Sequence, residues 1–311
     1  MADTTPNTPA QATPQATQGT GSDSNPGAVP PRPAETLAPK PPRRRAPRGY
    51  SVRTLPGFSV VAIFTLIALY APITILVIYS FNAGSSLAIW EGFSLRWYQQ
   101  AAANEAVQDA ALRSLILAAS AASIATVAAT MAALATTRTR HFPGRTMIYA
   151  LINQPLMVPE IVTAVALLIV FAQIKVMTGH TSMIYLIVAH TAFCVPFAYL
   201  PIRARLETMD MSLETAARDL YASRWLTFRR VTLPLMWPGI VAGLMLAFVI
   251  SLDDVVITEF VKSAGQETIP TYMLGQLRRV VTPEVNAIST VILLAGVILV
   301  ALFFRLTTRR G

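Results

Sequence analysis

Six runs of mostly apolar residues follow one another along the chain, separated by polar segments that contain most of its charges. They cover roughly residues 58–81, 114–136, 147–171, 183–203, 239–259 and 284–305. A helix needs about 20 mostly apolar residues to cross the hydrocarbon core of a bilayer, where every backbone polar group must be satisfied within the segment. The pattern therefore predicts an all-α integral membrane protein with six transmembrane helices.

The composition of individual runs predicts how they pack. The second run is dominated by Ala, Ser and Thr. Such small side chains let helices approach closely, so we expect this helix to lie against other helices rather than lipid. Pro155 and Pro159 in the third run, and Pro196 and Pro201 in the fourth, predict kinks supported by neighbouring helices. Residues 282–284, Thr-Pro-Glu, predict an N-cap followed by proline at the first position of the sixth helix.

The first 50 residues differ from the rest of the chain. They hold eleven of the 22 prolines and show no apolar periodicity, so they cannot bury enough surface to offset the entropy of ordering. We therefore expect a disordered tail over residues 1–50 and one membrane domain over residues 51–311. A basic cluster lies where the two meet, at Lys40, Arg43, Arg44, Arg45, Arg48 and Arg53.

Three interpretations of this basic cluster are open. A secretory signal is one, but the run at 58–81 exceeds a typical signal core and lacks a small-residue cleavage site. Nucleic-acid binding is the second. Beside a membrane segment we favour the third, an orientation signal that faces anionic lipid.

The distribution of charge predicts the topology. Only 13% of the residues are charged and 53% are apolar, whereas a soluble domain carries about 25% charged residues. With the N-terminus inside, 19 of the 25 Lys and Arg residues fall on inner segments and six on outer ones. This bias predicts that both termini are cytoplasmic, and it accounts for the basic composition without a nucleic-acid partner. The single cysteine, Cys194, excludes an internal disulfide and a CxxC metal site.

The inner segment 204–238, between the fourth and fifth runs, is amphipathic, too polar to span and too patterned for a mere linker. Its central residues are Glu214, Thr215, Ala216, Ala217, Arg218, Asp219, Leu220, Tyr221, Ala222 and Ser223, followed by Phe228, Leu233 and Pro234. This stretch resembles the EAA loop of bacterial ABC importer permeases. Residues 92–98, 246–256 and 283–287 are similar to the spermidine/putrescine branch of that family, and the resemblance covers residues 55–305.

The resemblance implies a set of partners. In the family the loop helix docks on a nucleotide-binding subunit, and a phosphate-cradling GxxxxGK[ST] motif is absent from this sequence, so ATP and Mg must be bound by that partner. Small Ala216 and Ala217 would seat closely in a groove, with Leu220, Phe228 and Leu233 as apolar anchors and Arg218, Arg229 and Arg230 at a polar rim. Without the resemblance, an amphipathic helix lying on the inner leaflet is the competing interpretation.

Two positions depart from the family pattern. The signature glutamate aligns with Thr215, although Glu214 stands just before it, and the signature glycine aligns with Tyr221. Glycine there would permit a positive φ, which a tyrosine resists. A differently built turn is therefore expected at Tyr221, and Glu214 is the candidate for the missing carboxylate.

Three carboxylates lie inside the predicted spans away from their ends. Glu160 is predicted near the middle of the third run, and Asp253 and Asp254 lie about two thirds of the way along the fifth. Carboxylates at membrane depth usually face a bundle interior or a water-filled path. No Lys or Arg lies inside a run away from its ends, so the buried charge favours a cationic solute. We rank Asp254 and Glu160 first as path residues and Asp253 behind them, because adjacent helix positions point about 100° apart.

The alternative for these acids is that they cap kinked helices. Other side chains were weighed in the same way. Tyr79, Tyr185 and Trp237 would suit cation–π contacts but are favoured as packing aromatics. His190 and Cys194 are four residues apart and favoured as packing residues, because two soft ligands do not make a metal site.

The sequence as a whole predicts a permease subunit, without catalysis or cofactor of its own, that moves a polyamine or related small cation by alternating access. As the resemblance implies, it would pair in the bacterial inner membrane with a second permease, an ATPase dimer inside and a solute-binding protein outside. An ion-driven secondary transporter and a membrane scaffold are the alternatives from other classes. Iron, an opine or an anion are the alternative solutes.

Overall fold

The computed structural model describes residues 58–86, 89–138, 143–279 and 282–308. The predicted tail over residues 1–50 and its basic cluster lie outside these ranges. Within them the regular elements are helices, apart from an isolated bridge between Asn82 and Phe93. The predicted all-α class is confirmed for the part of the chain that the structure covers.

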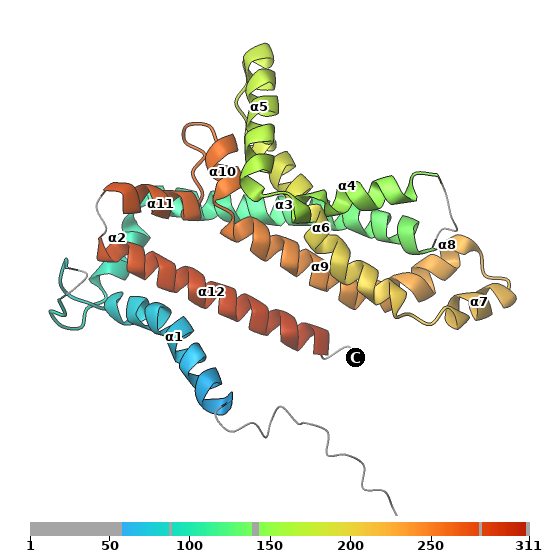
Figure 1. Cartoon of the computed structure of the whole chain (residues 1–311), viewed down its shortest axis with the longest axis horizontal. Helices are drawn as coiled ribbons and strands as arrows, with labels where there is room; N and C mark the ends of the chain where they lie inside the picture. The colour runs from blue at the N-terminus through green and yellow to red at the C-terminus, as the bar shows by residue number, and fades with distance from the viewer. Residues whose placement is uncertain (1–57, 87–88, 139–142, 280–281, 309–311) are drawn as a thin grey trace, which may run out of the picture. The chain divides into compact units, whose positions relative to one another are not determined.

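Six long helices contain the candidate spans (Figure 1). They are α1 (Phe58–Tyr79), α3 (Glu105–Arg138), α5 (Glu160–Thr178), α6 (Ile184–Glu207), α9 (Leu233–Asp253) and α12 (Pro283–Thr308). Among the described residues, six helices are long and apolar enough to cross a membrane. The predicted number of spans is therefore confirmed, and α12 begins at Pro283 as predicted.

Shorter helices join these long ones. They are α2 (Arg96–Ala103), α4 (Arg145–Met157), α7 (Ser212–Asp219), α8 (Arg224–Thr227), α10 (Val256–Val261), α11 (Ile269–Arg279) and a π-helical turn, η2 (Phe228–Thr232). Because α8 and η2 run directly into α9, the fifth span extends over Arg224–Asp253. The helix therefore starts well before the predicted residue 239.

The core is formed by α3, α6 and α9, which pack on one another. The alanines of α3 that face the other two helices are completely buried: Ala118, Ala121, Ala122, Ala125, Ala129 and Ala133. Their small side chains let the helices approach closely, and the Thr136 and Tyr199 hydroxyls hydrogen-bond across the contact at 2.9 Å. The predicted packing of the Ala-rich helix is confirmed.

Two glycines allow α9 to lie directly against α6. A Cβ atom on Gly243 would lie 2.6 Å from the Ala198 carbonyl oxygen, and one on Gly239 would lie 2.6 Å from Arg205 Cβ. Both distances are shorter than van der Waals contact, so a side chain at either position would push the helices apart. Pro196 and Pro201 lie inside α6, which nevertheless continues as one helix.

The third predicted span, 147–171, is wrong in its boundaries. The chain forms two helices there, α4 and α5, separated by Val158 and Pro159, which both have extended backbone angles. Proline disfavours helical geometry in the residue before it and has no N–H to donate, so the helix ends rather than kinks. Glu160 is consequently the first residue of α5, not the middle of a span.

The fifth predicted span, 239–259, also ends early. Helix α9 stops at Asp253, Asp254 is extended with φ −65° and ψ 128°, and α10 begins at Val256. The two aspartates therefore lie at a break between helices instead of within one. The break places their carboxyl groups in different surroundings.

Candidate functional site

Asp254 caps the helix that follows the break. Its side chain is 1% exposed, and its Oδ2 accepts the Thr258 backbone N–H and the Thr258 hydroxyl, each at 2.9 Å. Its Oδ1 accepts the Ile257 N–H at 3.3 Å. These contacts satisfy backbone donors that α10 would otherwise leave unpaired at its start. Asp254 therefore caps a helix, which is the alternative role predicted from the sequence.

His190 joins this cluster from α6. Its Nδ1 lies 2.9 Å from Ser251 Oγ, and its Nε2 lies 2.9 Å from Thr258 Oγ1 and 3.3 Å from Asp254 Oδ2. The Thr258 hydroxyl already donates its only proton to Asp254, so His190 Nε2 must be a donor. His190 is therefore hydrogen-bonded within the acidic cluster. The sequence predicted only that it packs in the core.

Glu160 meets the same cluster from the start of α5. Glu160 is half-buried, and α10, which Asp254 caps, packs against both α5 and α6. The breaks after Met157 and Asp253 thus bring together two carboxyl groups that lie far apart in the sequence. Paired acids in a surrounding of low dielectric attract a cation strongly. We call Glu160, His190 and Asp254 the acidic cluster.

Asp253 lies on a different face. It is the last residue of α9 and is exposed, whereas Asp254 lies in the extended break and is buried. The sequence ranked Asp254 ahead of Asp253 because it did not reveal the helix break. In the structure the buried Asp254 caps α10. Glu160 and Asp253 are the more accessible carboxylates of the three.

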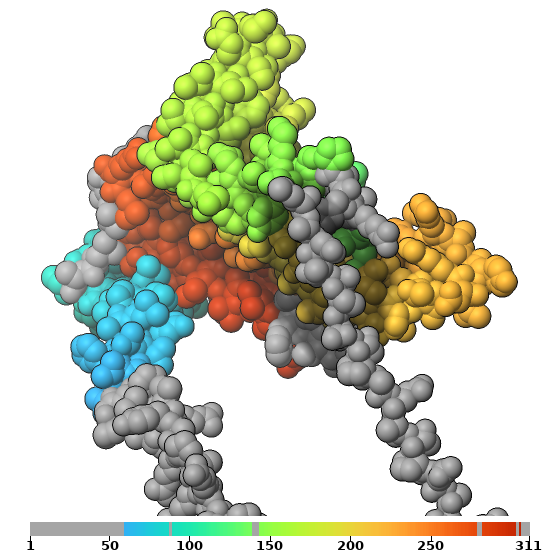
Figure 2. Space-filling view, turned by 45° about the vertical axis from the view of Figure 1, so that its right-hand side comes forward, coloured from blue at the N-terminus to red at the C-terminus, as the bar shows by residue number. Residues whose placement is uncertain are grey.

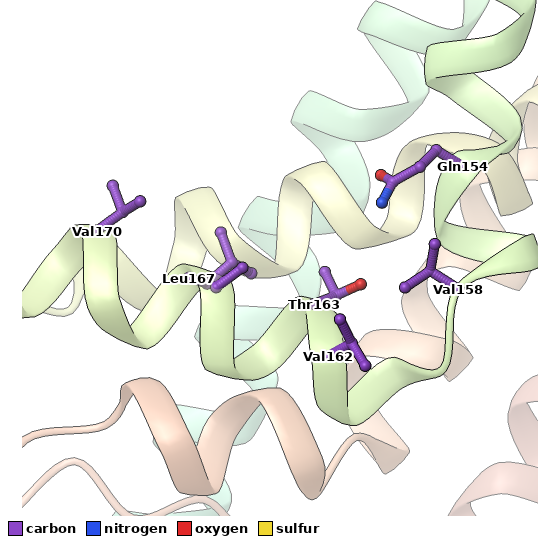
Figure 3. A pocket seen from close by; sticks show the side chains of 7 residues that line it. Gln154, Val158, Val162, Thr163, Leu167 and Val170 are labelled. Atoms are coloured by element: carbon purple, nitrogen blue, oxygen red, sulfur yellow. The ribbon is translucent and has the colours of Figure 1, made fainter.

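A hollow of about 230 Å³ lies beside the start of α5 (Figure 3). Its lining consists of Gln154, Val158, Val162, Thr163, Ala166, Leu167 and Val170. Gln154 comes from α4 and the others from the break and α5. The Thr163 hydroxyl is buried without a hydrogen-bond partner among the described residues. The hollow therefore combines an apolar wall with two polar groups, within one helical turn of Glu160.

The aromatic candidates have other partners. Tyr79 packs edge-on against Trp90 at 6.1 Å, and the Tyr185 ring lies 5.4 Å from that of Phe171. Trp237 is exposed on α9. The Cys194 thiol is buried and lies 3.5 Å from the Ala247 carbonyl oxygen, and the residues that the structure covers contain no group of three His, Cys, Asp or Glu able to hold a metal ion.

A second candidate site is the inner loop, where α7 and α8 meet beyond the ends of the core helices (Figures 1 and 2). Leu220 is 82% exposed, Tyr221 98% and Trp225 68%. Phe228 and Leu233, two of the predicted anchors, instead pack against the protein's own core. Trp225 stacks on Phe228 with centroids 5.7 Å apart and is an exposed aromatic side chain that the motif did not include.

The remaining motif residues are mostly on the surface of this loop. Exposed side chains are those of Thr215, Ala216, Arg218, Asp219, Ser223 and Pro234, with Ala217 and Ala222 half-buried. The arginines predicted at the rim, Arg229 and Arg230, are exposed too. Just before α7, the Ser212 backbone N–H donates to Asp210 at 2.8 Å and lowers the pKa of that carboxyl.

Tyr221 keeps the backbone conformation that glycine would have. Its φ is 59°, the Ala222 N–H donates to the Ala217 carbonyl at 3.1 Å, and the Tyr221 N–H donates to the Arg218 carbonyl at 2.9 Å. These two bonds define a Schellman motif at the end of α7. The expectation of a differently built turn is wrong: the turn is retained, and the tyrosine accepts the left-handed conformation.

Glu214 is the exception among the motif residues because it is buried. Its Oε1 lies 3.2 Å from Arg138 Nε and accepts the Thr232 hydroxyl at 3.1 Å. The neighbouring Thr215 is exposed. The carboxylate in this loop therefore points into the protein.

Among the described residues, six membrane-length helices indicate a multi-pass membrane protein, in which buried and half-buried carboxyl groups mark a candidate solute path. Relatives of known sequence narrow this class. The family described as "Binding-protein-dependent transport system inner membrane component" matches residues 125–310, which is more than half of the chain. The chain belongs to this family.

Individual relatives match over most of their length. The chain is 36% identical to the putrescine transport system permease protein PotI of Escherichia coli K12, over 75% of this chain and 84% of the relative. It is 38% identical to the spermidine/putrescine transport system permease protein PotC of Haemophilus influenzae, over 78% of this chain and 93% of the relative. The E. coli K12 PotC is 34% identical, over 80% and 92%.

Solved structures share the fold at lower identity. A bacterial ABC transporter involved in the import of the acidic polysaccharide alginate has a TM-score of 0.61 at 17% identity, covering 80% of this chain and 93% of that one. The MetNI methionine ABC transporter, in an inward-facing conformation, has a TM-score of 0.52 at 16% identity, covering 64% and 94%. These likenesses identify the arrangement of the helices.

Proposed function

We propose that this chain is a permease subunit of an ATP-binding-cassette importer for putrescine, spermidine or a related small organic cation. PotI and PotC are named as putrescine and spermidine/putrescine permeases, and each is more than one third identical to this chain. These relatives support the solute class. The single observation that carries the proposal is the placement of Glu160, Asp253 and Asp254 at two helix breaks inside the bundle, because Glu160 and Asp253 are accessible to a cation there. The chain supplies half of the path and catalyses no reaction.

The path would use the carboxylates and the hollow together. A polyamine carries ammonium groups separated by methylene groups, so it needs acids spaced along an apolar surface. Glu160 and Asp253 are accessible, and the apolar hollow begins within a turn of Glu160. Asp254 caps α10, which packs against α5. Each ammonium group would exchange water for a carboxylate, while the methylenes lie on the Val and Leu side chains.

Movement would enter through the inner loop. Leu220, Tyr221 and Trp225 form an exposed apolar tip, and exposed aromatic and apolar groups are the usual anchors of a protein interface. A nucleotide-hydrolysing dimer seated on this tip would bind ATP, close, and shift α7 and α8. The permease would then alternate between inward-facing and outward-facing states.

The other partners follow from surfaces and charge. Most large side chains of α1, and many of α5, are exposed, which provides area for a second, homologous permease and for lipid. The excess of Lys and Arg on alternate segments supports a cytoplasmic location for both termini. A solute-binding protein would deliver the cation on the opposite side, near α2 and α11.

One observation favours a second candidate, an ion-driven carrier. The acidic cluster places a histidine between two hydroxyls and a carboxylate, and intramembrane His, Asp and Glu chains are used as proton relays. In that case uptake would follow the ion gradient, and the exposed tip at Leu220 would have no ATPase partner.

Vesicle transport separates the two candidates. The full complex, reconstituted in liposomes with its binding protein, is assayed for uptake of radiolabelled putrescine. We expect uptake to require ATP on the side of the ATPase, to stop with vanadate and to persist with an uncoupler. Uptake that ignores ATP and vanadate but stops with the uncoupler would overturn the importer and support the carrier.

A further inference from the structure

Glu214 connects three elements through one carboxylate oxygen. It belongs to α7, while Arg138 is the last residue of α3 and Thr232 is the last residue of η2, the turn that leads into α9. Arg138 Nε and the Thr232 hydroxyl lie 3.2 and 3.1 Å from the same Oε1. We call Arg138, Glu214 and Thr232 the Glu214 clamp.

Burial distinguishes this clamp from a surface ion pair: Arg138 Nε and Nη2 are both buried and make no hydrogen bond among the described residues, so Arg138 and Glu214 interact as an ion pair. The side chains of Glu214 and Arg138 are 8% and 17% exposed, so water screens their attraction only weakly. A buried carboxylate without its partner is strongly unfavourable. By contrast, the Arg203–Glu207 pair near the same end of the bundle is 30% and 51% exposed, and such pairs contribute little.

The clamp is also the attachment of α7 to α3. The helix packs mainly on α8 and η2, which in turn packs on α9. Its other motif side chains are largely exposed. Besides its chain connection to α6 through residues 208–211, which include the buried Met209, α7 reaches the core through η2 to α9 and through the Glu214–Arg138 pair to α3.

The route to α9 passes through an unusual turn. The Leu233 N–H donates to the Phe228 carbonyl five residues earlier, which makes η2 a π-helical turn. Such turns occur frequently at functional sites and are places where helices bend. Thr232, the residue that donates to Glu214, closes this turn.

We propose that the Glu214 clamp is the positioning device that makes α3 and α9 follow α7 together when the ATPase subunit moves it. Glu214 acts within the chain, because a buried carboxylate paired with Arg138 and Thr232 is not available to the ATPase surface. The exposed tip contacts the ATPase subunit, and the clamp holds α7 against α3 and η2 so that they move together. This inference rests on the proposed function, in which α7 receives motion from an ATPase.

The test compares ATP hydrolysis and putrescine uptake in the reconstituted full complex. Variants are Glu214→Gln, which keeps the shape and loses the charge, Arg138→Glu, and the exchanged pair Arg138→Glu with Glu214→Arg. The milder Thr232→Val removes one hydrogen bond and guards against failure to fold. The matched control is Glu207→Gln, which removes an acid from an exposed pair.

We expect the single clamp variants to retain the ATPase subunit and its hydrolysis, while putrescine moved per ATP falls about tenfold. The exchanged pair should recover at least half of the lost ratio, and Glu207→Gln should match the unchanged chain. An unaltered ratio in Glu214→Gln and Thr232→Val would overturn the inference. So would loss of the ATPase subunit from the clamp variants, because Glu214 would then serve docking. If the unchanged chain has no ATPase subunit, the proposed function itself fails.

Discussion

Neighbouring acids at the end of α9 have different surroundings. Asp254 accepts hydrogen bonds from the start of α10 and lies 3.3 Å from His190 Nε2, whereas Asp253 is exposed. The sequence predicted that only one of them faces the path, because helix neighbours diverge. It ranked Asp254 first but did not reveal the break after Asp253, which places Asp254 in an extended conformation where it caps α10.

Substitutions at these two positions should separate charge from capping. Asn caps a helix about as well as Asp, so Asp254→Asn should leave the complex assembled while putrescine uptake falls about tenfold. Asp254→Ala should in addition lower the free energy of unfolding by about 1 kcal/mol because it loses the cap. Thermal unfolding in detergent and vesicle uptake measure the two effects. Unchanged uptake in Asp254→Asn would remove Asp254 from the path.

Tyr221 has a left-handed backbone conformation, which is unfavourable for a residue with a side chain. A left-handed conformation costs a residue with a Cβ about 1–2 kcal/mol. Glycine avoids this cost but loses more conformational entropy on folding, so its net advantage is smaller. Tyr221→Gly should therefore raise the free energy of unfolding by up to about 1 kcal/mol and weaken co-purification of the ATPase subunit. Tyr221→Ala, the control, should weaken co-purification without the gain. Destabilisation by Tyr221→Gly would contradict the strained turn.

At the scale of elements, periodicity and length predicted the helices better than their ends. The runs predicted six spans, and small residues predicted that α3 lies inside the bundle. Proline gave an ambiguous signal, because Pro159 ends a helix while Pro196 and Pro201 remain within one. What decides is whether neighbouring helices support the freed carbonyls, and a single sequence does not contain that information.

The contact between α6 and α9 gives an element-scale prediction. Gly243→Ala places a Cβ 2.6 Å from the Ala198 carbonyl oxygen, so it should lower the free energy of unfolding by roughly 1–3 kcal/mol. Gly296→Ala is the matched control, since a Cβ there has no neighbour within 4 Å among the described residues. Thermal unfolding in detergent should show a lower midpoint for Gly243→Ala alone. Equal midpoints would mean that the helices lie farther apart than described.

At the scale of the whole molecule, the chain separates two tasks. The acidic cluster lies where the starts of α5 and α10 meet α6, the hollow lies beside α4 and α5, and the exposed tip lies where α7 and α8 meet. Helices α3, α6 and α9 connect them, and the Glu214 clamp fixes α7 to two of these three. The motif showed where the loop is, but burial of Glu214 against Arg138 depends on residues far apart in the sequence.

Site-directed cross-linking tests the central claim, that energy enters at the exposed tip from a separate ATPase subunit. Cys194 is buried, so in a Cys194→Ala background a short thiol cross-linker would react at an introduced cysteine alone. Leu220→Cys should form an adduct with the co-expressed ATPase subunit in the purified complex. Val176→Cys, 80% exposed near the end of α5, should form none. The account is contradicted if Leu220→Cys yields no adduct, or if both positions react equally.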